Sequence, residues 1–327
     1  MPVHNAVAYL GEALESIAAQ TWTDFEVVAV DDASTDGSGA KLSEHARRWP
    51  WLRVILRPAR GGVAVALNTG FSLCEGELIA RMDADDVCMP ERFARQVAFM
   101  DAHPDVGVCG GAVRVFGGGR MEVVKPPTDD DAIRAWLVFG SAFIHPAVMF
   151  RRSVVRQMDG PYAPVVGVED YDLWLRLAAV TRFGNLPEEL LRYRVHPGQY
   201  SANKKAEHQR MLDEVRMEWL RARGIRWNDV EREAHVSLAF DRPARCDVRA
   251  RAAVLWLRRL LREVPASGWC GESTLREMVG ERWWAWVAAE RTGLAAAGIY
   301  GCGPVARHGR LEVRRILRLA ASRGLRD

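Results

Sequence analysis

Glu77-Leu78-Ile79-Ala80-Arg81-Met82-Asp83-Ala84-Asp85-Asp86 is the stretch that decides the fold. Its apolar run, Leu78 to Met82, has the length of a buried β-strand and ends in three carboxylates within four residues, Asp83, Asp85 and Asp86. Carboxylates this close raise one another's pKa unless a cation neutralises them, and hard ions such as Mg²⁺ or Mn²⁺ prefer oxygen ligands. The stretch predicts a metal site at the carboxyl end of a strand. The alternative is an acidic turn in which Asp86 caps the next helix.

Strand-like and helix-like patterns alternate on both sides of this stretch. We expect strands at residues 25–30, 54–56, 78–82, 106–116 and 147–150, and helices at residues 5–20, 38–49, 62–73, 90–103, 129–139 and 169–180. Asn5 is the expected cap of the first helix, Gly110-Gly111 interrupt one strand, and Gly117-Gly118-Gly119 mark a flexible loop. This alternation predicts an α/β fold with a mostly parallel sheet, in which ligands bind at the carboxyl ends of the strands.

A second acidic turn follows the strand at residues 25–30. Asp31 and Asp32 stand at its carboxyl end, within Asp31-Asp32-Ala33-Ser34-Thr35-Asp36-Gly37. Their carboxylates would accept hydrogen bonds from a base N–H or a ribose hydroxyl. Because Asp, Ser, Thr and Gly also form ordinary turns, a plain turn is the alternative.

Two further polar residues are candidates for chemistry. A helix that begins near Glu169 places Asp170 on the same face as Trp174, so Asp170 points inward and is either a helix cap or a base. His196 follows a short apolar run in a turn-rich setting. It would ligate a metal or touch a phosphate, or else it is an ordinary surface histidine.

The composition is that of a globular protein. The chain has 327 residues, 49% hydrophobic and 27% charged, enough for one large domain or two modest ones. It contains no apolar run of the roughly 18–20 residues that span a bilayer, and its first residues lack the apolar core of a signal peptide, so we expect a cytoplasmic location. Its 6 cysteines show no paired spacing and are expected to be buried thiols.

Charge is distributed unevenly along the chain. Residues 1–204 carry 21 Lys and Arg against 26 Asp and Glu, whereas residues 205–327 carry 24 against 16. We therefore expect a catalytic domain at 1–204 and a helical, basic C-terminal region at 205–327, with helices near 252–264 and 311–319. A basic region faces nucleic acid, anionic lipid or a phosphate-bearing acceptor, or is simply a solvated helical surface.

Five motifs together resemble one enzyme family, the family 2 glycosyltransferases. They cover about residues 1–200 in the order found in that family: Pro2-Val3-His4-Asn5, Val30-Asp31-Asp32-Ala33-Ser34-Thr35-Asp36, Gly76-Glu77 through Asp83-Ala84-Asp85-Asp86, His145-Pro146-Ala147-Val148-Met149-Phe150 and Glu169-Asp170-Tyr171-Asp172-Leu173-Trp174. The resemblance implies a GT-A fold, with a Rossmann-like sheet flanked by helices. It also implies a nucleotide-sugar donor, a divalent cation (Mn²⁺ or Mg²⁺) and inversion at the anomeric carbon.

The resemblance assigns the donor pocket by position. Asp31 and Asp32 would hold the base and ribose of the nucleotide sugar, with Pro2 and Val3 lining the same pocket. Asp83 would approach both the ribose and the metal.

It also assigns the reacting centre. Asp85 would bind the metal that bridges the diphosphate, Asp83 would share it, and His196 would be a late metal or phosphate contact. The bound cation would stabilise the leaving diphosphate, and Asp170 would take the acceptor hydroxyl proton as general base.

Some positions depart from the family pattern. The family has an apolar run before the Pro2-Val3 equivalent that forms a central strand, and Met1 stands in its place here. A truncated first strand would leave backbone groups unpaired, a cost expected to exceed the about 5–15 kcal/mol that keeps domains folded. The expectation is that the natural product starts upstream or that this chain folds weakly. Ala33 and Arg60-Gly61 also differ from the usual residues.

These inferences predict an inverting glycosyltransferase of bacterial cell-surface polysaccharide assembly that acts on a glycan or lipid-linked acceptor. No nucleic-acid partner is expected, whereas peripheral contact with an anionic membrane is, through Trp283, Trp284 and Trp286, unless these side chains pack in a core. The alternatives are a catalytically silent scaffold of a polysaccharide complex and a sugar nucleotidyltransferase. The latter would need a Gly-rich basic phosphate loop near the start of the sequence, where none is visible.

Overall fold

The computed structural model describes residues 1–158, 160–163, 167–199, 205–239 and 250–290. The chain divides into two compact units. The first comprises Met1–Ile133 and Ser141–His208, and the second comprises Arg134–Gly140 and Gln209–Asp327. The short segment Arg134–Gly140 therefore belongs with the C-terminal helices, which the sequence pattern did not indicate.

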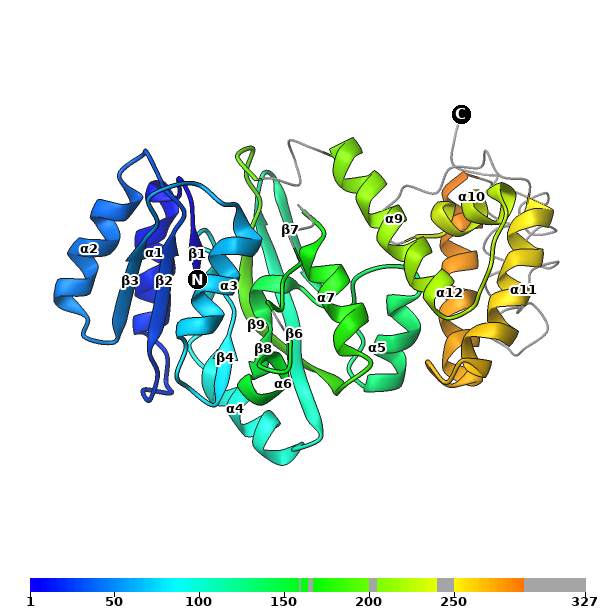
Figure 1. The fold of residues 1–327 in the computed structure, drawn as a ribbon, viewed down its shortest axis with the longest axis horizontal. Helices are drawn as coiled ribbons and strands as arrows, with labels where there is room; N and C mark the ends of the chain where they lie inside the picture. The colour runs from blue at the N-terminus through cyan, green and yellow to red at the C-terminus, as the bar shows by residue number, and fades with distance from the viewer. Residues whose placement is uncertain (159, 164–166, 200–204, 240–249, 291–327) are drawn as a thin grey trace. The chain divides into compact units, whose positions relative to one another are not determined.

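The first sheet of the first unit is fully parallel (Figure 1). Its strand order is β1-β2-β3, with β1 at Pro2–Val3, β2 at Val27–Asp31 and β3 at Leu52–Leu56. Helices α1 (Val7–Ala18), α2 (Ser38–Arg48) and α3 (Val63–Leu73) connect these strands and lead on to the next one. Every residue of β2 is buried, as its unbroken apolar run predicts.

The first strand is short, as expected. β1 has two residues and pairs in register with β2, Pro2 with Val30 and Val3 with Asp31. The α-amino group of Met1 donates to the Val28 carbonyl oxygen at 2.9 Å, and burial lowers the pKa of this amino group to about 6. Among the described strands β1 pairs only with β2, so β4 lies in a separate sheet.

The second sheet mixes parallel and antiparallel pairs. Its order is β4-β8-β6-β9-β5, and β7 pairs with β6 outside this path; the strands are β4 (Leu78–Ala80), β5 (Val87–Cys88), β6 (Val106–Gly117), β7 (Arg120–Val124), β8 (Met149–Arg151) and β9 (Arg182–Arg194). Only β6 and β9 run parallel to each other here. The architecture is α/β, as predicted: the first sheet is wholly parallel, and the second contains the long parallel pair of β6 and β9.

Glycines let β9 approach β6 closely. A Cβ atom would lie 2.3 Å from Asn185 Oδ1 if added at Gly110 and 2.4 Å from Leu190 Cδ1 if added at Gly111. These residues do not interrupt β6, which continues through a shift of register between Gly111 and Ala112. The glycines at 117–119 have positive φ and turn the chain from β6 into β7, so they form a hairpin.

Helix α1 begins differently from the prediction. Asn5 has a φ of 50° and its side-chain oxygen accepts the Thr35 amide at 2.9 Å, so it cannot cap the helix. The amide of Val7 instead donates to Asp36 Oδ2 at 2.9 Å. The start of α1 is thus held by the turn that follows β2, and the predicted Asn5 cap is wrong.

Three further helices lie near the predicted positions: α4 (Arg92–Ala102), α5 (Asp130–Leu137) and α7 (Glu169–Leu177). The 3₁₀ turn η1 (His145–Ala147) and the short helix α6 (Arg152–Val155) were not predicted. Helix α5 runs on from the first unit into the segment Arg134–Gly140 of the second.

The described part of the second unit is helical. It contains α10 (Asp229–Ser237), α11 (Ala250–Ala266), α12 (Glu272–Glu290) and, from Gln209 onward, α9 (Lys205–Ala222). The predicted helix at 252–264 lies inside α11, while the one at 311–319 lies outside the described residues. No helix in the described part of the chain combines the length and the apolar character needed to span a bilayer.

The tryptophans of α12 belong to the core of the second unit. Trp283 and Trp286 are 0% and 2% exposed, and their rings stack at 5.2 Å. The predicted lipid-facing role is wrong for both, because a side chain packed in a helical core presents no surface to a membrane; Trp284 is partly exposed. Of the four described cysteines, Cys88, Cys109 and Cys270 are buried and Cys74 is half-buried, and none of the four is in a disulfide bond.

Candidate active site

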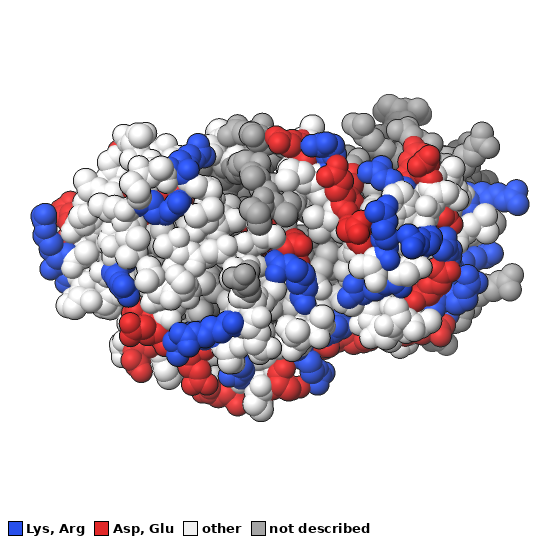
Figure 2. Space-filling model, viewed as in Figure 1, with Lys and Arg blue, Asp and Glu red and all other residues white. Residues whose placement is uncertain are grey.

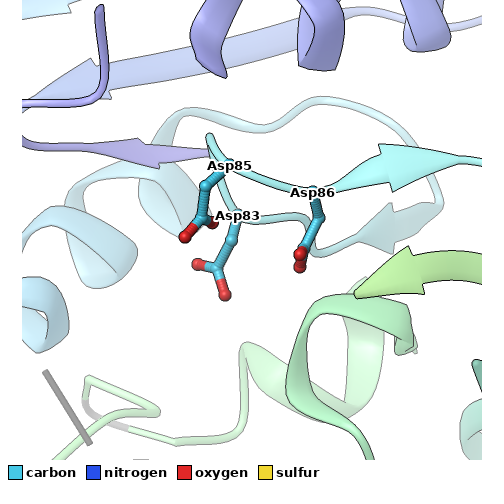
Figure 3. A group of neighbouring side chains, drawn as sticks. All are labelled: Asp83, Asp85 and Asp86. Atoms are coloured by element: carbon cyan, nitrogen blue, oxygen red, sulfur yellow. The ribbon is translucent and has the colours of Figure 1, made fainter. Parts of the chain in front are cut away.

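The loop between β4 and β5 carries the predicted acidic cluster. One ligand oxygen from each of Asp83, Asp85 and Asp86 lies within 4.8 Å of the others. Figure 3 shows the three carboxylates pointing to the same side of the loop. The loop places them together because β4 ends at Ala80 and β5 begins at Val87, so the chain turns back over this segment.

Asp86 is a buried member of the carboxylate cluster and not the helix cap considered as an alternative. It is 1% exposed, and its Oδ1 atom accepts the backbone N–H of Arg194 at 2.8 Å. Strand β5 separates it from α4, so it cannot cap that helix, and the cap interpretation is wrong. Its buried Oδ2 atom has no hydrogen-bond partner among the described residues. Burial, with Asp83 and Asp85 nearby, raises the pKa of Asp86 well above its usual range.

A buried arginine partly neutralises the cluster. Arg81 is 5% exposed, and its Nη1 atom donates to Asp83 Oδ2 at 2.6 Å. Loss of hydration raises the pKa of Asp83, while Arg81 opposes this shift. The sequence contained the clue, a charged residue inside an apolar strand, but the prediction of residues 78–82 as a purely apolar run passed over it.

His196 lies against the acidic loop. Its Nε2 atom is 2.9 Å from Asp85 Oδ2, and its ring lies 4.6 Å from the ring of Tyr9. Arg194 donates from Nε to the Asp85 carbonyl oxygen at 2.7 Å, and a guanidinium nitrogen pairs with Glu12. His196 is 18% exposed, so the alternative of an ordinary surface histidine does not describe it.

The two carboxylates of the acidic turn after β2, Asp31 and Asp32, have different surroundings. Asp32 accepts the backbone N–H groups of Gly61 and Gly62 at 2.9 and 2.7 Å and pairs with the Arg57 guanidinium. Asp31 accepts the Ser34 amide at 3.2 Å through Oδ2, and its buried Oδ1 atom has no partner among the described residues. Both carboxylates lie at the end of β2, beside Pro2 and Val3 of β1.

Asp170 lies in the first turn of α7. Its Oδ1 atom accepts the amide of Tyr171 at 2.7 Å, and the helix has Val168 as its N-cap without a side-chain cap. Asp170 is therefore not the N-cap residue, but its carboxylate does accept one of the first-turn N–H groups of α7, as the cap alternative predicted. Asp170 is half-exposed, whereas Trp174 on the same face is 0% exposed. Loss of hydration raises the pKa of Asp170.

The preceding carboxylate, Glu169, is also perturbed. It is 7% exposed and accepts the Gly167 amide at 2.7 Å. Burial, reinforced by Asp170, raises the pKa of Glu169 to about 7. The two neighbouring carboxyl groups therefore differ in environment, since Glu169 is buried and Asp170 is half-buried.

One hydrogen-bonded pair near these carboxylates was not predicted from the sequence. His145 Nε2 lies 2.7 Å from the Tyr162 hydroxyl, and both residues are buried. Burial and the nearby Arg81 charge hold the pKa of His145 well below its usual range, so the imidazole is neutral. Asn68 holds Tyr162 in place through bonds to its backbone N–H and carbonyl at 3.0 and 2.8 Å. Nothing in the local sequence pattern pairs residues so far apart.

A family model described as glycosyl transferase family 2 matches residues 1–158. The amylovoran biosynthesis glycosyltransferase AmsE of Erwinia amylovora is 33% identical over 213 residues, 64% of this chain and 78% of that protein. The chain belongs to glycosyl transferase family 2. The O-antigen biosynthesis glycosyltransferase WbnJ of Escherichia coli is likewise 33% identical over 201 residues, 60% of this chain and 78% of that protein. This family 2 member is a glycosyltransferase, as its motifs predicted.

Solved structures of glycosyltransferases share its fold. S. aureus TarS 1–349 in complex with UDP-GlcNAc superposes with a TM-score of 0.56 at 17% identity, covering 98% of this chain and 89% of that one. The mannosyltransferase PcManGT of Pyrobaculum calidifontis, in complex with GDP-Man and Mn2+, gives 0.54 at 20% identity, with coverage of 98% and 82%. The likeness confirms the expected GT-A fold.

Proposed function

We propose that this family 2 enzyme transfers a sugar from a nucleoside-diphosphate sugar to a hydroxyl group of a glycan or lipid-linked acceptor, with inversion at the anomeric carbon. The observation that carries the proposal is the carboxylate cluster of Asp83, Asp85 and Asp86, on which His196 converges from the end of β9. The names of the relatives, in amylovoran and O-antigen biosynthesis, support an acceptor in bacterial surface polysaccharide assembly.

The carboxylate cluster fits a divalent cation, Mn²⁺ or Mg²⁺. Its three ligand oxygens lie within 4.8 Å of one another, and Asp86 Oδ2 has no partner among the described residues. Asp83, Asp85 and His196 would hold the ion. When bound, it would offset the negative charge that develops on the departing diphosphate. The Mn2+ bound with GDP-Man in PcManGT supports this assignment.

The donor nucleotide would occupy the carboxyl end of β2. We assign Asp31 to the base, because its Oδ1 atom is left without a partner among the described residues and would accept a base N–H. Asp32 would act indirectly, since its carboxylate already holds the Arg57 guanidinium and the Gly61 and Gly62 amides. Pro2 and Val3 of β1 would form the adjoining wall, with Asp83 toward the ribose.

Asp170 would act as the general base. Its Oδ1 atom bonds to the Tyr171 amide, which orients the carboxylate and leaves Oδ2 to accept the acceptor hydroxyl proton. Its raised pKa makes the carboxylate a stronger base than a solvated aspartate. A single displacement by the acceptor hydroxyl inverts the anomeric centre. It needs only one carboxylate to take the hydroxyl proton, and Asp170 would be that carboxylate.

The test separates donor binding from transfer. Nucleotide-sugar donors are screened by thermal shift with Mn²⁺ present, and release of nucleoside diphosphate is then measured for the donor that binds. We expect Asp85→Ala to abolish metal-dependent donor binding, and Asp170→Asn to retain binding while transfer stops. Asp172→Asn is the matched control, because Asp172 lies on the same helix and pairs with Arg176.

Three outcomes contradict the proposal. Transfer that survives Asp170→Asn removes Asp170 as the base. A protein that binds no nucleotide sugar with any metal is a scaffold, the non-enzymatic alternative. Formation of a nucleotide sugar from a sugar phosphate and a nucleoside triphosphate identifies a nucleotidyltransferase.

A further inference from the structure

An open groove lies in the second unit, whereas the site residues assigned above belong to the first. It encloses a volume of about 470 Å³ and is lined by five residues of α11 and two of α12: Arg258, Leu261, Arg262, Pro265, Ala266, Glu272 and Arg276. Arg258, Leu261, Arg262 and Pro265 follow one another at helical spacing, so they share one face of α11. Arg276 comes from the second turn of α12. Two helices therefore bring arginines to a single groove.

The carboxylates nearby leave these arginines incompletely neutralised. Helix α11 contains four arginines and a single acid, Glu263. Arg259 points to another side of the helix and forms ion pairs with Glu263 at 2.8 Å and with Glu231 at 3.0 Å. Arg262 only shares Glu263, at 3.2 Å, and Arg258 has no ion pair among the described residues. The groove face of α11 thus carries excess positive charge beside a face where the charge is balanced.

The third arginine of the groove has one carboxylate partner. Arg276 bonds to Glu272 at 2.5 Å, one turn away on α12. This carboxylate is 62% exposed, so an incoming anion can replace it at little cost in desolvation. With three guanidinium groups and one carboxylate, the groove carries net positive charge, and Figure 2 shows blue basic side chains gathered over this helical unit among fewer red ones.

We propose that this groove binds a phosphate or diphosphate ester. Guanidinium groups bind phosphate oxygens through pairs of parallel N–H bonds, which gives arginine a preference for this chemistry. Leu261, Pro265 and Ala266 form an apolar wall beside the arginines, which suits the carbon next to an ester phosphate. The ligand is either a phosphate in solution or the phosphate head group of a lipid, and binding requires neither the sugar donor nor the metal.

The experiment measures binding to the full chain in two arms without donor or metal. One arm titrates inorganic pyrophosphate by calorimetry, and the other sediments the protein with phosphatidylcholine vesicles that contain or lack phosphatidic acid. We expect saturable binding in at least one arm, weakened about tenfold in Arg258→Gln/Arg262→Gln. Glu272→Gln frees Arg276 and is expected to tighten binding, a gain that damage to the fold would not produce. Binding in the pyrophosphate arm assigns a soluble ligand, and binding confined to the vesicle arm assigns a lipid head group.

Arg210→Gln is the control for general charge, because Arg210 is an exposed arginine of α9 paired with Glu214 at 3.8 Å. It is expected to bind like the unaltered chain. Absence of binding in both arms overturns the proposal. So does binding that Arg210→Gln weakens as much as the groove variants do, or that Glu272→Gln leaves unchanged.

Discussion

His196 Nε2 lies 2.9 Å from Asp85 Oδ2, although the two residues are 111 positions apart in the sequence. Arg194, two residues before His196, reaches the same loop through bonds to Asp85 and Asp86. The end of β9 is thus tied to the acidic loop by both a side chain and the backbone. The carboxylates are held in a defined arrangement from outside their own loop, which is the condition for a preorganised metal site.

His196→Ala is expected to lower Mn²⁺ affinity about tenfold, because the imidazole orients Asp85 or ligates the ion itself. The measurement is an electron paramagnetic resonance titration of free Mn²⁺ in the presence of a nucleoside diphosphate. His103→Ala is the control, since His103 is exposed and bonds to Phe99 on α4. Equal affinity in the two variants would show that His196 plays no part in the site.

Arg92→Met is expected to lower the free energy of unfolding by about 2–4 kcal/mol. Arg92 is 0% exposed, and its Nη2 atom donates to the carbonyl oxygens of Arg81 at 2.7 Å and Val148 at 3.2 Å. The substitution keeps the apolar stem but removes the guanidinium, so the buried Arg81 carbonyl oxygen loses this hydrogen bond, whereas the Val148 carbonyl oxygen keeps the Arg81 backbone N–H at 2.9 Å. Urea denaturation measures the loss. Arg95→Met, on the exposed side of the same helix, is expected to change stability by less than about 0.5 kcal/mol; a similar loss in both variants would contradict the role of the buried bonds.

Local patterns predicted the elements that are apolar throughout. β2 and the strand before the acidic loop were recognisable because a continuous apolar run between turn residues has few other interpretations. β9 was not predicted, because its residues include Arg182, Glu188 and Arg192, and its stability comes from pairing with β6. The predicted Asn5 cap failed for a similar reason, since its partner is Thr35, far along the chain.

The candidate site was predicted to the extent that its residues stand at strand ends. Asp31, Asp83 and Asp85 follow strands whose carboxyl ends define where ligands bind in α/β folds. Arg81 and the His145–Tyr162 pair were missed. Neither a buried arginine nor a hydrogen bond between separate segments produces a periodic pattern of apolar residues in the sequence. The burial of Trp283 and Trp286 was equally hidden, since a helix that is apolar on several sides suits both a core and a lipid surface.

Gly110→Ala is expected to lower the free energy of unfolding by about 1–3 kcal/mol. The new Cβ atom would lie 2.3 Å from Asn185 Oδ1, so either β9 or the buried Asn185 must shift. Gly70→Ala is the matched control in α3, where the nearest atom to the new Cβ is Val30 Cγ2 at 3.6 Å. It is expected to stabilise by up to about 1 kcal/mol, because alanine favours a helix. Urea denaturation measures the free energy of unfolding of both variants. If both substitutions changed it in the same direction, the close-approach argument would be contradicted.

The second unit is expected to lose stability as the pH falls below about 6.5 because of His235. This residue is 0% exposed, its Nδ1 atom accepts the Trp256 N–H at 3.1 Å, and its Nε2 atom donates to the Val138 carbonyl oxygen at 3.1 Å. These two bonds fit the neutral ring. Burial, together with the Arg216 charge, lowers the pKa of His235 to about 3 from its ordinary 6.5.

The sign follows from proton uptake. Between the two pKa values the unfolded chain binds a proton that the folded chain does not, so stability is complete above about pH 6.5 and declines by about 1.4 kcal/mol per pH unit below it. His235→Gln keeps a donor and an acceptor but cannot bind the proton. The His235→Gln variant is expected to be less stable than the unaltered chain at neutral pH. Between about pH 6 and pH 4 its free energy of unfolding is expected to fall less steeply, by about 1.4 kcal/mol per pH unit. Unfolding followed by tryptophan fluorescence measures both slopes, and equal slopes would remove His235 as the source of the pH dependence.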